Sequence, residues 1–296
     1  MYENFAQIRQ AARDNRGARA AVPMGHDEAS LEALNMAAEE DIATSVVFAP
    51  RALVEETAGR TGLKLHPSIE IANVATEADA AIEAVKCVSG GGATILMKGL
   101  LKTSGFLRAV LDKEHGLRTG RVLSHVAVVH VPRQDRLVAI TDGGMIPRPT
   151  AEQIVQIVQN AAGVMVRLGC GTPRAALLAA VEVEDENLPE TALFASIARK
   201  GIEGVYVQGP LAVDGAMDPE AAAIKRITGE VAGRADILVT PDLSCGNIFA
   251  KAFMYMTDTE VGGMIAGAAA PVVMLSRSDA ARTKLNSLAL GVVTGA

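Results

Sequence analysis

The sequence contains no tryptophan, and aromatic residues make up only 3% of its 296 residues. Proteins that bind single-stranded nucleic acids stack the bases on aromatic side chains inside a positively charged groove. This chain instead has a net charge of −6 at pH 7, which provides no general attraction for nucleic acid or for an anionic membrane. We therefore expect neither as a partner, and any anionic ligand must be held by a local group of basic side chains.

Cysteine and long apolar runs are also scarce. Cys87, Cys170 and Cys245 are widely spaced and form no C-x-x-C pair, so the pattern indicates neither a disulfide framework nor a metal site. The first residues lack the charged and apolar regions of a signal peptide. The longest uncharged run, Val261–Ser276, is too short to span a bilayer and contains Pro271. These absences predict a cytoplasmic protein with reduced thiols.

What the chain has is a large apolar fraction, 49%, arranged in alternating segments. Strand-like runs and helix-period runs follow one another through the first half of the chain, which implies right-handed crossovers and a parallel sheet. The strands expected there are 44–48, 69–74 and 94–97, and the helices are 27–40, 51–60 and 77–88. The sequence therefore predicts an α/β fold.

The alternation is interrupted in the middle of the chain. Val122–Val131 and Leu137–Ile140 are joined by a short polar segment, which is typical of an antiparallel hairpin. We place a domain boundary near this hairpin and expect the last strand and helix to return to the first sheet. The predicted domains are residues 1–124 plus 265–296 and residues 125–264, with a cleft between them.

Two later segments carry clear helix-start signals. Thr150 and Gln153 have the spacing of a capping box ahead of an apolar stripe that continues to Met165. Asp218, Pro219 and Glu220 provide a cap, a proline at the first position and an acid in the first turn. We expect a helix to begin at each place.

The most informative polar turn is Ser276-Arg277, which follows the apolar run Val272–Leu275. Ligands of open α/β sheets bind at the carboxyl ends of the strands, and the planar fork of an arginine suits a phosphate or carboxylate. Alternatively, Ser276 or Ser278 caps the following helix and Arg277 pairs with a surface acid. The spacing alone does not separate these two interpretations.

Three other polar turns follow expected strands. Thr103 precedes an expected helix, and Lys98, Lys102 and Arg108, with the exposed N–H groups of that helix start, would form an anion site, or else a solvated basic turn. Asp214 follows Gly209-Pro210 and is more simply a loop acid. Asn247 and Lys251 are four residues apart and share a helix face, although a capped helix with a surface lysine has the same pattern. Cys245, close by, has no obvious histidine partner and is better explained as structural.

Several blocks of the sequence resemble the phosphate acetyl/butyryltransferases. The blocks similar to the hallmarks of that family, in the same order, are Pro147–Gln153, Pro241-Asp242 with Gly246–Ile248 and Lys251, and Ser276-Arg277. Other blocks resemble the butyryltransferase branch more closely, namely Met97–Gly99 with Thr103 and Leu107-Arg108, Gly209–Asp214, and Lys284–Ala289. Together they extend over nearly the whole chain.

The resemblance implies a fold and a reaction. The family has two α/β domains with largely parallel sheets, like isocitrate and isopropylmalate dehydrogenases, with the active site in the interdomain cleft, and it is usually dimeric. It exchanges acyl-CoA and phosphate for acyl phosphate and CoA without a covalent enzyme intermediate. The expected partners are therefore CoA or acyl-CoA, phosphate or acyl phosphate, and a second copy of the chain. CoA and phosphate are substrates, and no cofactor or metal is expected.

The resemblance also suggests roles for individual residues. Arg277 would hold the phosphoryl oxygens and Ser276 would donate to the developing oxyanion. Arg108 would bind a second anion. Lys98, Thr103, Asp214, Asn247 and Lys251 complete the expected substrate-binding set.

One position departs from the acetyltransferases, in which an aspartate proposed as the base lies six residues beyond the arginine. Thr283 occupies that position here, and Asp279 is the nearest carboxylate. We therefore take Asp279 as the candidate base, although a thiol needs little help because it is partly ionised near neutral pH.

Two other functions compete with this one. A regulatory acyl-CoA-binding module would have the same fold without turnover, but Ser276 and Arg277 are both retained. A metal-dependent dehydrogenase of the same broad fold needs several acids and a nicotinamide site, whereas Asp236 and Asp242 are too few and no G-x-G-x-x-G follows the first strand.

Overall fold

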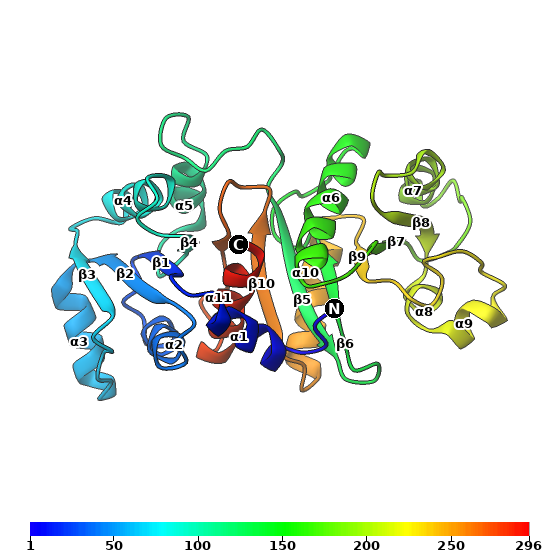
Figure 1. Cartoon of the computed structure of the whole chain (residues 1–296). Helices are drawn as coiled ribbons and strands as arrows, with labels where there is room; N and C mark the ends of the chain where they lie inside the picture. Colours follow the sequence, from blue (N-terminus) through cyan, green and yellow to red (C-terminus); the bar gives the residue numbers. More distant parts are fainter. Residues whose placement is uncertain (296) are drawn as a thin grey trace. The chain divides into compact units, whose positions relative to one another are not determined.

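The computed structural model describes residues 1–295 (Figure 1). The chain divides into two compact units. The terminal unit comprises Phe5–Arg121 and Val261–Ala296, and the central unit comprises Met1–Asn4 and Val122–Glu260. The domain boundaries expected from the sequence, 1–124 plus 265–296 and 125–264, remain predictions.

In the terminal unit, six strands lie side by side, and all neighbouring pairs are parallel except the last. Their order is β3 (Ile69–Asn73), β2 (Thr44–Ala49), β1 (Arg19–Pro23), β4 (Ile95–Met97), β11 (Val272–Val273) and β10 (Val261–Ala266). The helices of this unit are α1 (Phe5–Asp14), α2 (Glu28–Glu39), α3 (Arg51–Thr61), α4 (Glu77–Ser89), α5 (Thr103–Val110) and α11 (Ala281–Gly295). The predicted parallel sheet, and the return of the last strand to it beside β4, are confirmed.

The helix α11 lies in the core of the terminal unit. It packs against α1, α2 and β10, so the first and the last helix of the chain lie side by side (Figure 1). Eleven of its residues are buried, and the polar ones among them are hydrogen-bonded within the unit. Asn286, for example, accepts a hydrogen bond of 2.6 Å from Arg9 Nη1, and Ser287 Oγ accepts one of 2.9 Å from the backbone N–H of Gly263.

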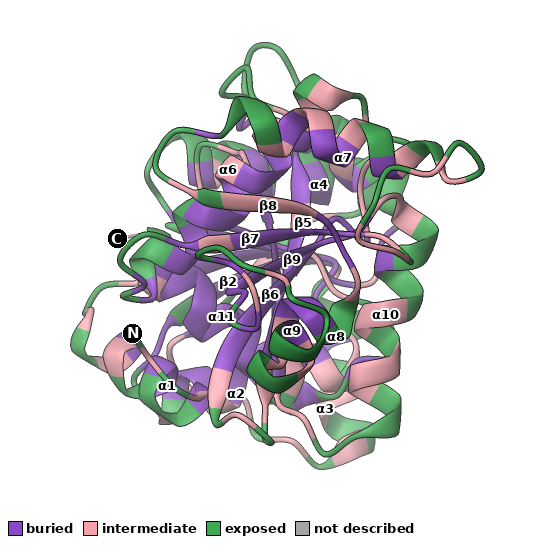
Figure 2. Cartoon of the chain, turned by 90° about the vertical axis from the view of Figure 1, so that its right-hand side faces the viewer, coloured by how far each residue is buried: buried purple, intermediate pink, exposed green. Residues whose placement is uncertain are grey.

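The central unit begins with the predicted hairpin. β5 (Ser124–Val131) and β6 (Arg136–Thr141) pair antiparallel, and β6, β9 (Ile237–Val239), β7 (Arg174–Leu178) and β8 (Tyr206–Leu211) then follow as parallel neighbours. Its helices are α6 (Ala151–Arg167), α7 (Pro189–Lys200), α8 (Val213–Met217), α9 (Pro219–Ile224) and α10 (Leu243–Met256). The strands β6, β7 and β9 are buried, whereas the helices carry exposed outer faces (Figure 2).

Both predicted helix starts of the central unit are confirmed. Thr150 and Gln153 form a reciprocal capping box at α6, which satisfies two backbone N–H groups that the helix itself leaves free. The Asp218 side chain accepts from two backbone N–H groups at the start of α9, and Pro219 occupies the first turn.

Two local predictions, and the alternative of a serine cap, are not what the structure contains. The strand expected over Val272–Leu275 ends at Val273, and neither serine caps α11, which begins at Ala281. The reason is a side-chain hydrogen bond, because the Asp279 carboxylate accepts from the backbone N–H of Ser276 at 2.8 Å and folds residues 276–279 into a turn. The strand expected at Gly204–Val207 instead runs to Leu211, so that Gly209-Pro210 lies within β8.

No helix within residues 1–295 is both long and apolar enough to cross a bilayer.

Candidate active site

The carboxyl ends of three adjacent parallel strands, β1, β4 and β11, meet at one edge of the terminal unit. Backbone hydrogen bonds continue beyond the strands, from Lys98 N to Val273 O at 2.8 Å and from Leu100 N to Met24 O at 2.7 Å. Gly99 has to be glycine, because a Cβ there would collide with the Met24 backbone. The segments after the three strands are thereby held together, and the predicted residues Lys98, Ser276 and Arg277 all lie on them.

The Ser276–Asp279 turn presents its hydroxyl and guanidinium groups to solvent. Ser276 and Arg277 are exposed, and Ser276 Oγ is 3.0 Å from Ser278 Oγ. Within residues 1–295 Arg277 makes no ion pair or side-chain hydrogen bond. The alternative in which Arg277 pairs with a surface acid is therefore not what the structure contains.

Asp279 is buried beneath this turn. Besides accepting from Ser276 N, it donates its own backbone N–H to Ser276 O at 3.2 Å. Its carboxylate therefore fixes the conformation of the residues that carry Ser276 and Arg277. Its expected role as the base that accepts the thiol proton stays a prediction.

Two lysines are buried at the same edge. The residue Lys98 is 6% exposed and its Nζ lies 3.3 Å from Gly99 O, while Lys284 is 3% exposed and its Nζ lies 3.5 Å from Ser276 O. Burial lowers the pKa of Lys98, and the charges of Arg277 and Lys284 lower it further, against a smaller opposing effect of Asp27 and Glu77. Three positive groups therefore share this edge.

Sequence reasoning selected Lys98 and missed Lys284 as a site residue. The available signal was a lysine in the first turns of the apolar last helix, close to Arg282, and such a lysine is equally well explained as solvated. His26 was also missed. It follows β1, and its Nδ1 is buried without a hydrogen-bond partner among residues 1–295.

The predicted residues Thr103 and Arg108 belong to α5, which follows the Lys98 segment. Thr103 is the first residue of the helix, and Arg108 lies in its last turn rather than its first turns as expected, because the helix has only eight residues. Both are exposed. Arg108 lines a separate groove of about 400 Å³ between α4 and α5, together with Ile82 and Lys86.

In the central unit, Asn247 and Lys251 lie one turn apart on α10. Asn247 Nδ2 donates to Gly143 O at 3.1 Å, while Lys251 is exposed. Gly143 and Gly246 allow the helix start to press against the loop after β6, since a Cβ on Gly246 would lie 2.6 Å from Thr240 Oγ1. The block containing Gly246 and Asn247 therefore builds a rigid turn.

Asp142 organises the same loop, and sequence reasoning missed it. It is 3% exposed, and its carboxylate accepts from four backbone N–H groups at 2.9–3.0 Å, those of His125, Gly144, Met145 and Ile146. A carboxylate in the hairpin gave no sign of this, because its partners become available only when the loop folds over it.

Asp214 lies on the short helix α8, not in an irregular segment as expected. It is exposed and accepts a hydrogen bond of 2.9 Å from Lys225 Nζ, which also contacts Glu182 at 2.7 Å. The hydrogen bonds from Lys225 and from the backbone N–H of Gly215 lower the pKa of Asp214. In this structure Asp214 belongs to a surface ion-pair network, and its substrate-binding role stays a prediction.

Cysteine and metal chemistry receive no support at these sites. Desolvation, followed by the negative charges of Asp242 and Glu190, raises the pKa of the Cys245 thiol, which disfavours the nucleophilic thiolate. In the part of the chain that the structure describes, no group of three or more histidine, cysteine, aspartate or glutamate residues is arranged to hold a metal ion.

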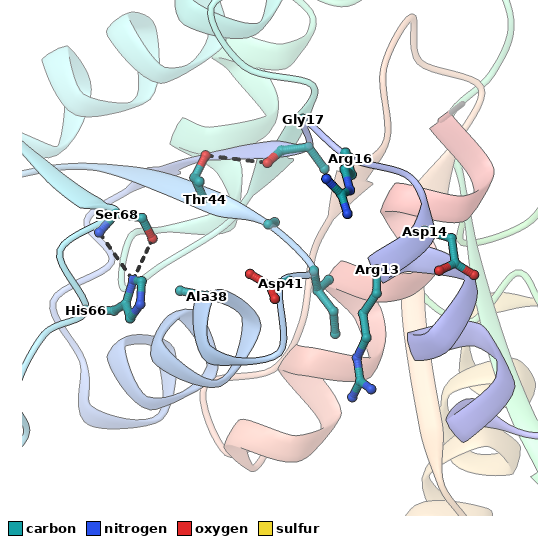
Figure 3. Close-up of a pocket in the computed structure, with 12 residues that line it drawn as sticks. Arg13, Asp14, Arg16, Gly17, Ala38, Asp41, Thr44, His66 and Ser68 are labelled. Atoms are coloured by element: carbon teal, nitrogen blue, oxygen red, sulfur yellow. Dashed lines mark hydrogen bonds between the residues drawn. The ribbon is translucent and has the colours of Figure 1, made fainter.

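A cavity of about 550 Å³ lies at the opposite edge of the terminal unit, before β2 and β3 (Figure 3). His66 Nδ1 is 2.8 Å from Ser68 Oγ there, and both positive and negative side chains line the cavity, namely Arg13, Arg16, Asp14 and Asp41. Because opposite charges offset one another, this cavity suits an anion less well than the carboxyl edge does. The fold and these sites thus define an α/β protein in which three cationic side chains gather where the strands of one sheet end.

Comparisons with known proteins identify the family. A family model described as "Phosphate acetyl/butaryl transferase" matches residues 67–292. The chain is 38% identical to a phosphate butyryltransferase of Clostridium beijerinckii over 100% of this chain and 99% of the relative. It is 40% identical to a phosphate acetyltransferase of Rhizobium meliloti over 91% of this chain and 86% of the relative.

A solved structure agrees with these sequence matches. The branched-chain phosphotransacylase of Enterococcus faecalis superimposes with a TM-score of 0.84 at 32% identity, covering 94% of this chain and 99% of that chain. The chain belongs to the phosphate acetyl/butyryltransferase family, whose members are acyltransferases. The resemblance found in the sequence is confirmed.

Proposed function

We propose that this protein transfers a short-chain acyl group reversibly between CoA and inorganic phosphate. The observation that supports this most directly is the group of three cations, Lys98, Arg277 and Lys284, beside the exposed Ser276 hydroxyl. Such a group suits a dianionic phosphate next to a carbonyl whose oxygen becomes negative. The relatives named above carry names for this type of transfer.

The chemistry proceeds in one displacement within a ternary complex. The CoA sulfur attacks the carbonyl carbon of the acyl phosphate, a C–S bond forms, and the C–O bond to phosphate breaks with its electron pair leaving on phosphate. Arg277 holds the phosphoryl oxygens through charge-assisted hydrogen bonds. Ser276 donates its hydroxyl proton in a hydrogen bond to the oxyanion.

The thiol proton needs only a weak acceptor, because a thiol is partly ionised near neutral pH. Asp279 is the carboxylate proposed from the sequence, yet its bonds to Ser276 point to a positioning role. Holding the turn keeps Ser276 and Arg277 in one geometry for both directions of the reaction.

The remaining predicted residues extend the substrate site. We assign Thr103 and Arg108 to a second anionic group, either the acyl phosphate or a phosphate of CoA, and we keep Asn247, Lys251 and Asp214 as substrate contacts from the central unit. A site in the cleft between two domains, a homodimer, a cytoplasmic location, and the absence of a cofactor all belong to this proposal.

The length of the transferred acyl chain differs among members of the family. The relatives include enzymes named for both butyryl and acetyl transfer, and the blocks around Lys98 and Lys284 resemble the butyryl branch. We therefore propose a preference for chains longer than acetyl. A series of acyl-CoAs of increasing length, assayed for phosphate-dependent thiol release, would rank the substrates.

The same assay tests the function itself. Phosphate-dependent consumption of an acyl-CoA, with acyl phosphate formed in equal amount, is the expected result. Tight CoA binding without turnover for every acyl-CoA would instead favour the regulatory acyl-CoA-binding module. Turnover without phosphate would indicate a hydrolase and contradict both.

A further inference from the structure

Lys284 stands out as a buried charge without a counter-charge. It lies on α11 with 3% of its surface exposed. Within residues 1–295 its Nζ donates one hydrogen bond, to Ser276 O at 3.5 Å, and forms no ion pair. Lysines are almost never this buried unless they are paired, because an unpaired ammonium loses its hydration without compensation.

Lys98 is also a buried lysine that forms no ion pair within residues 1–295, and it lies at the same edge of the sheet. Lys98 is 6% exposed, and among residues 1–295 its ammonium has Gly99 O, at 3.3 Å, as its one partner. The two lysines are close enough that the charge of Lys284 contributes to lowering the pKa of Lys98. Two like charges in one partly desolvated place repel each other more strongly than they would in water.

The nearby acids do not neutralise this pair. Asp27 and Glu77 act on Lys98 only as minor opposing charges. Asp279 is buried in the same segment, but its carboxylate is bonded to Ser276 N, and it lies within ion-pair distance of neither lysine. The unliganded protein therefore keeps an excess of buried positive charge at this edge.

A doubly charged anion would remove that excess. The acceptor of the Lys284 hydrogen bond is the carbonyl of Ser276, next in sequence to Arg277, so the ammonium lies at the base of the turn that carries the proposed catalytic pair. We propose that Lys284 is a phosphate-binding residue and that, together with Lys98 and Arg277, it holds inorganic phosphate or the phosphoryl group of the acyl phosphate. This inference rests on the proposed function for its substrate and adds a residue to its site.

Such a site would favour a leaving group that gains negative charge. When the C–O bond of the acyl phosphate breaks, the released phosphate carries the electron pair, and fixed ammonium groups stabilise that charge without reorganisation. In the reverse direction the same groups position phosphate for its attack on the carbonyl carbon of the acyl-CoA. Lys284 thus acts on the phosphate side of the reaction and not on CoA.

The experiment compares Lys284→Met with wild type and with Lys64→Met, which makes the same change at an exposed lysine elsewhere in the terminal unit. Thermal unfolding is measured without phosphate and with increasing inorganic phosphate alone. We expect phosphate to raise the Tm of wild type and of Lys64→Met, and to raise that of Lys284→Met clearly less at the same phosphate concentrations. Without phosphate, Lys284→Met should unfold at the same temperature as wild type or higher, because a buried repulsion is removed.

Kinetics provide the second readout. Lys284→Met should raise the KM for phosphate by at least about tenfold, the loss expected for a hydrogen bond to a charged group, and leave the KM for acyl-CoA unchanged. Lys284→Arg keeps the charge and should recover part of the phosphate response. If Lys284→Met does not fold, the same Tm and KM measurements are made on Lys284→Gln.

A merely structural lysine would give a different result. An unchanged phosphate KM, with the phosphate-dependent rise in Tm retained, would overturn the inference even if the enzyme is active. Conversely, phosphate alone could stabilise wild type through Lys284 while no acyl-CoA is consumed. That outcome would reject the proposed function and support the phosphate site.

Discussion

Two clusters of buried charged residues, one in each unit, differ in whether the buried charge has a counter-charge. In the central unit, Asp236 is 4% exposed and lies between Arg136 Nη1 at 3.3 Å and Arg174 Nη1 at 3.4 Å. It also accepts from the Arg174 backbone N–H at 3.0 Å. In the terminal unit, Lys98 and Lys284 are buried to a similar degree and, in the part of the chain that the structure describes, have carbonyl oxygens as their only acceptors.

This difference in pairing indicates that the Asp236 cluster is structural and that the lysine cluster binds a ligand. The Asp236 cluster lies where β6, β7 and β9 begin, and the Asp236 carboxylate provides both arginines with a counter-charge. There, burial and the Asp236 carboxylate raise the pKa of the Cys170 thiol to about 11, so this cysteine stays protonated and inert. The lysine cluster lies where strands end, and no acid among residues 1–295 forms an ion pair with it. A buried charge left uncompensated in a stable fold is a reasonable sign of a ligand.

The largest expected effect comes from the exposed member of the uncompensated cluster. Arg277→Ala should lower phosphate-dependent kcat/KM by about 10³-fold, because two charge-assisted hydrogen bonds to the transferred group are lost. The free energy of unfolding should not change, since the side chain is exposed and unpaired within residues 1–295. Initial rates and urea denaturation measure the two quantities, with Arg234→Ala as the exposed control. A variant with near wild-type rates would remove Arg277 from the site.

In the Asp236 cluster, by contrast, a substitution should lower stability and leave activity unchanged. Asp236→Ala leaves Arg136 and Arg174 facing each other and should reduce the free energy of unfolding by about 3 kcal/mol, the lower end for breaking a buried pair, because both arginines are partly exposed. Urea denaturation measures this loss. Activity per folded molecule should be retained. A strong loss of turnover with unchanged stability would show that the Asp236 cluster is functional after all.

Ser276→Ala tests the hydroxyl next to the cation cluster. We expect kcat to fall about 10²-fold, as for the loss of one oxyanion donor, while the KM for acyl-CoA stays close to that of wild type. The turn itself should persist, since Asp279 binds the Ser276 backbone and not its hydroxyl. A change confined to the KM for acyl-CoA would contradict the oxyanion role.

The smallest effect is a pH dependence of stability at Lys98. Its pKa is lowered from 10.5 in the folded state, so the folded protein is penalised for keeping this lysine charged at neutral pH. That penalty disappears as pH rises from the folded pKa towards the unfolded value. Without phosphate, Lys98→Met should therefore be more stable than wild type at neutral pH.

The advantage of Lys98→Met should shrink as pH approaches 10.5. Paired urea denaturation curves across this range measure it, and Lys64→Met provides the baseline for an exposed lysine. The charges that act on Lys98 are those of Arg277, Lys284, Asp27 and Glu77. A difference that stays constant with pH would mean that Lys98 titrates alike in the folded and unfolded states.

The features predicted well from the sequence are those with a local cause. The capping box at Thr150 and the start of α9 at Asp218 depend on residues within four positions of each other. The polar end of β4 was found because the apolar run stops there. Family blocks around Ser276-Arg277 then led to the function class, which the comparisons confirmed.

The features that were missed depend on distant partners. Asp142 gathers four backbone N–H groups only once its loop is folded. Asp214 looked like a free acid, whereas Lys225 from the following helical segment pairs with it. The strand after Pro271 stopped early because Asp279 reaches back to Ser276 N. None of these is encoded in the period or composition of a single segment.

The sequence by itself determined the α/β class, the hairpin, the helix caps and the acyltransferase family, because apolar periodicity, capping geometry and ordered blocks are all properties of neighbouring residues. Only the tertiary structure decided which charges are buried and which of them are paired. Lys284 and Lys64 are chemically identical, yet α11 carries the first into the core of the terminal unit and leaves the second in water. The free energy of a charge is set by the water and the counter-charges around it, and those come from parts of the chain far away in sequence.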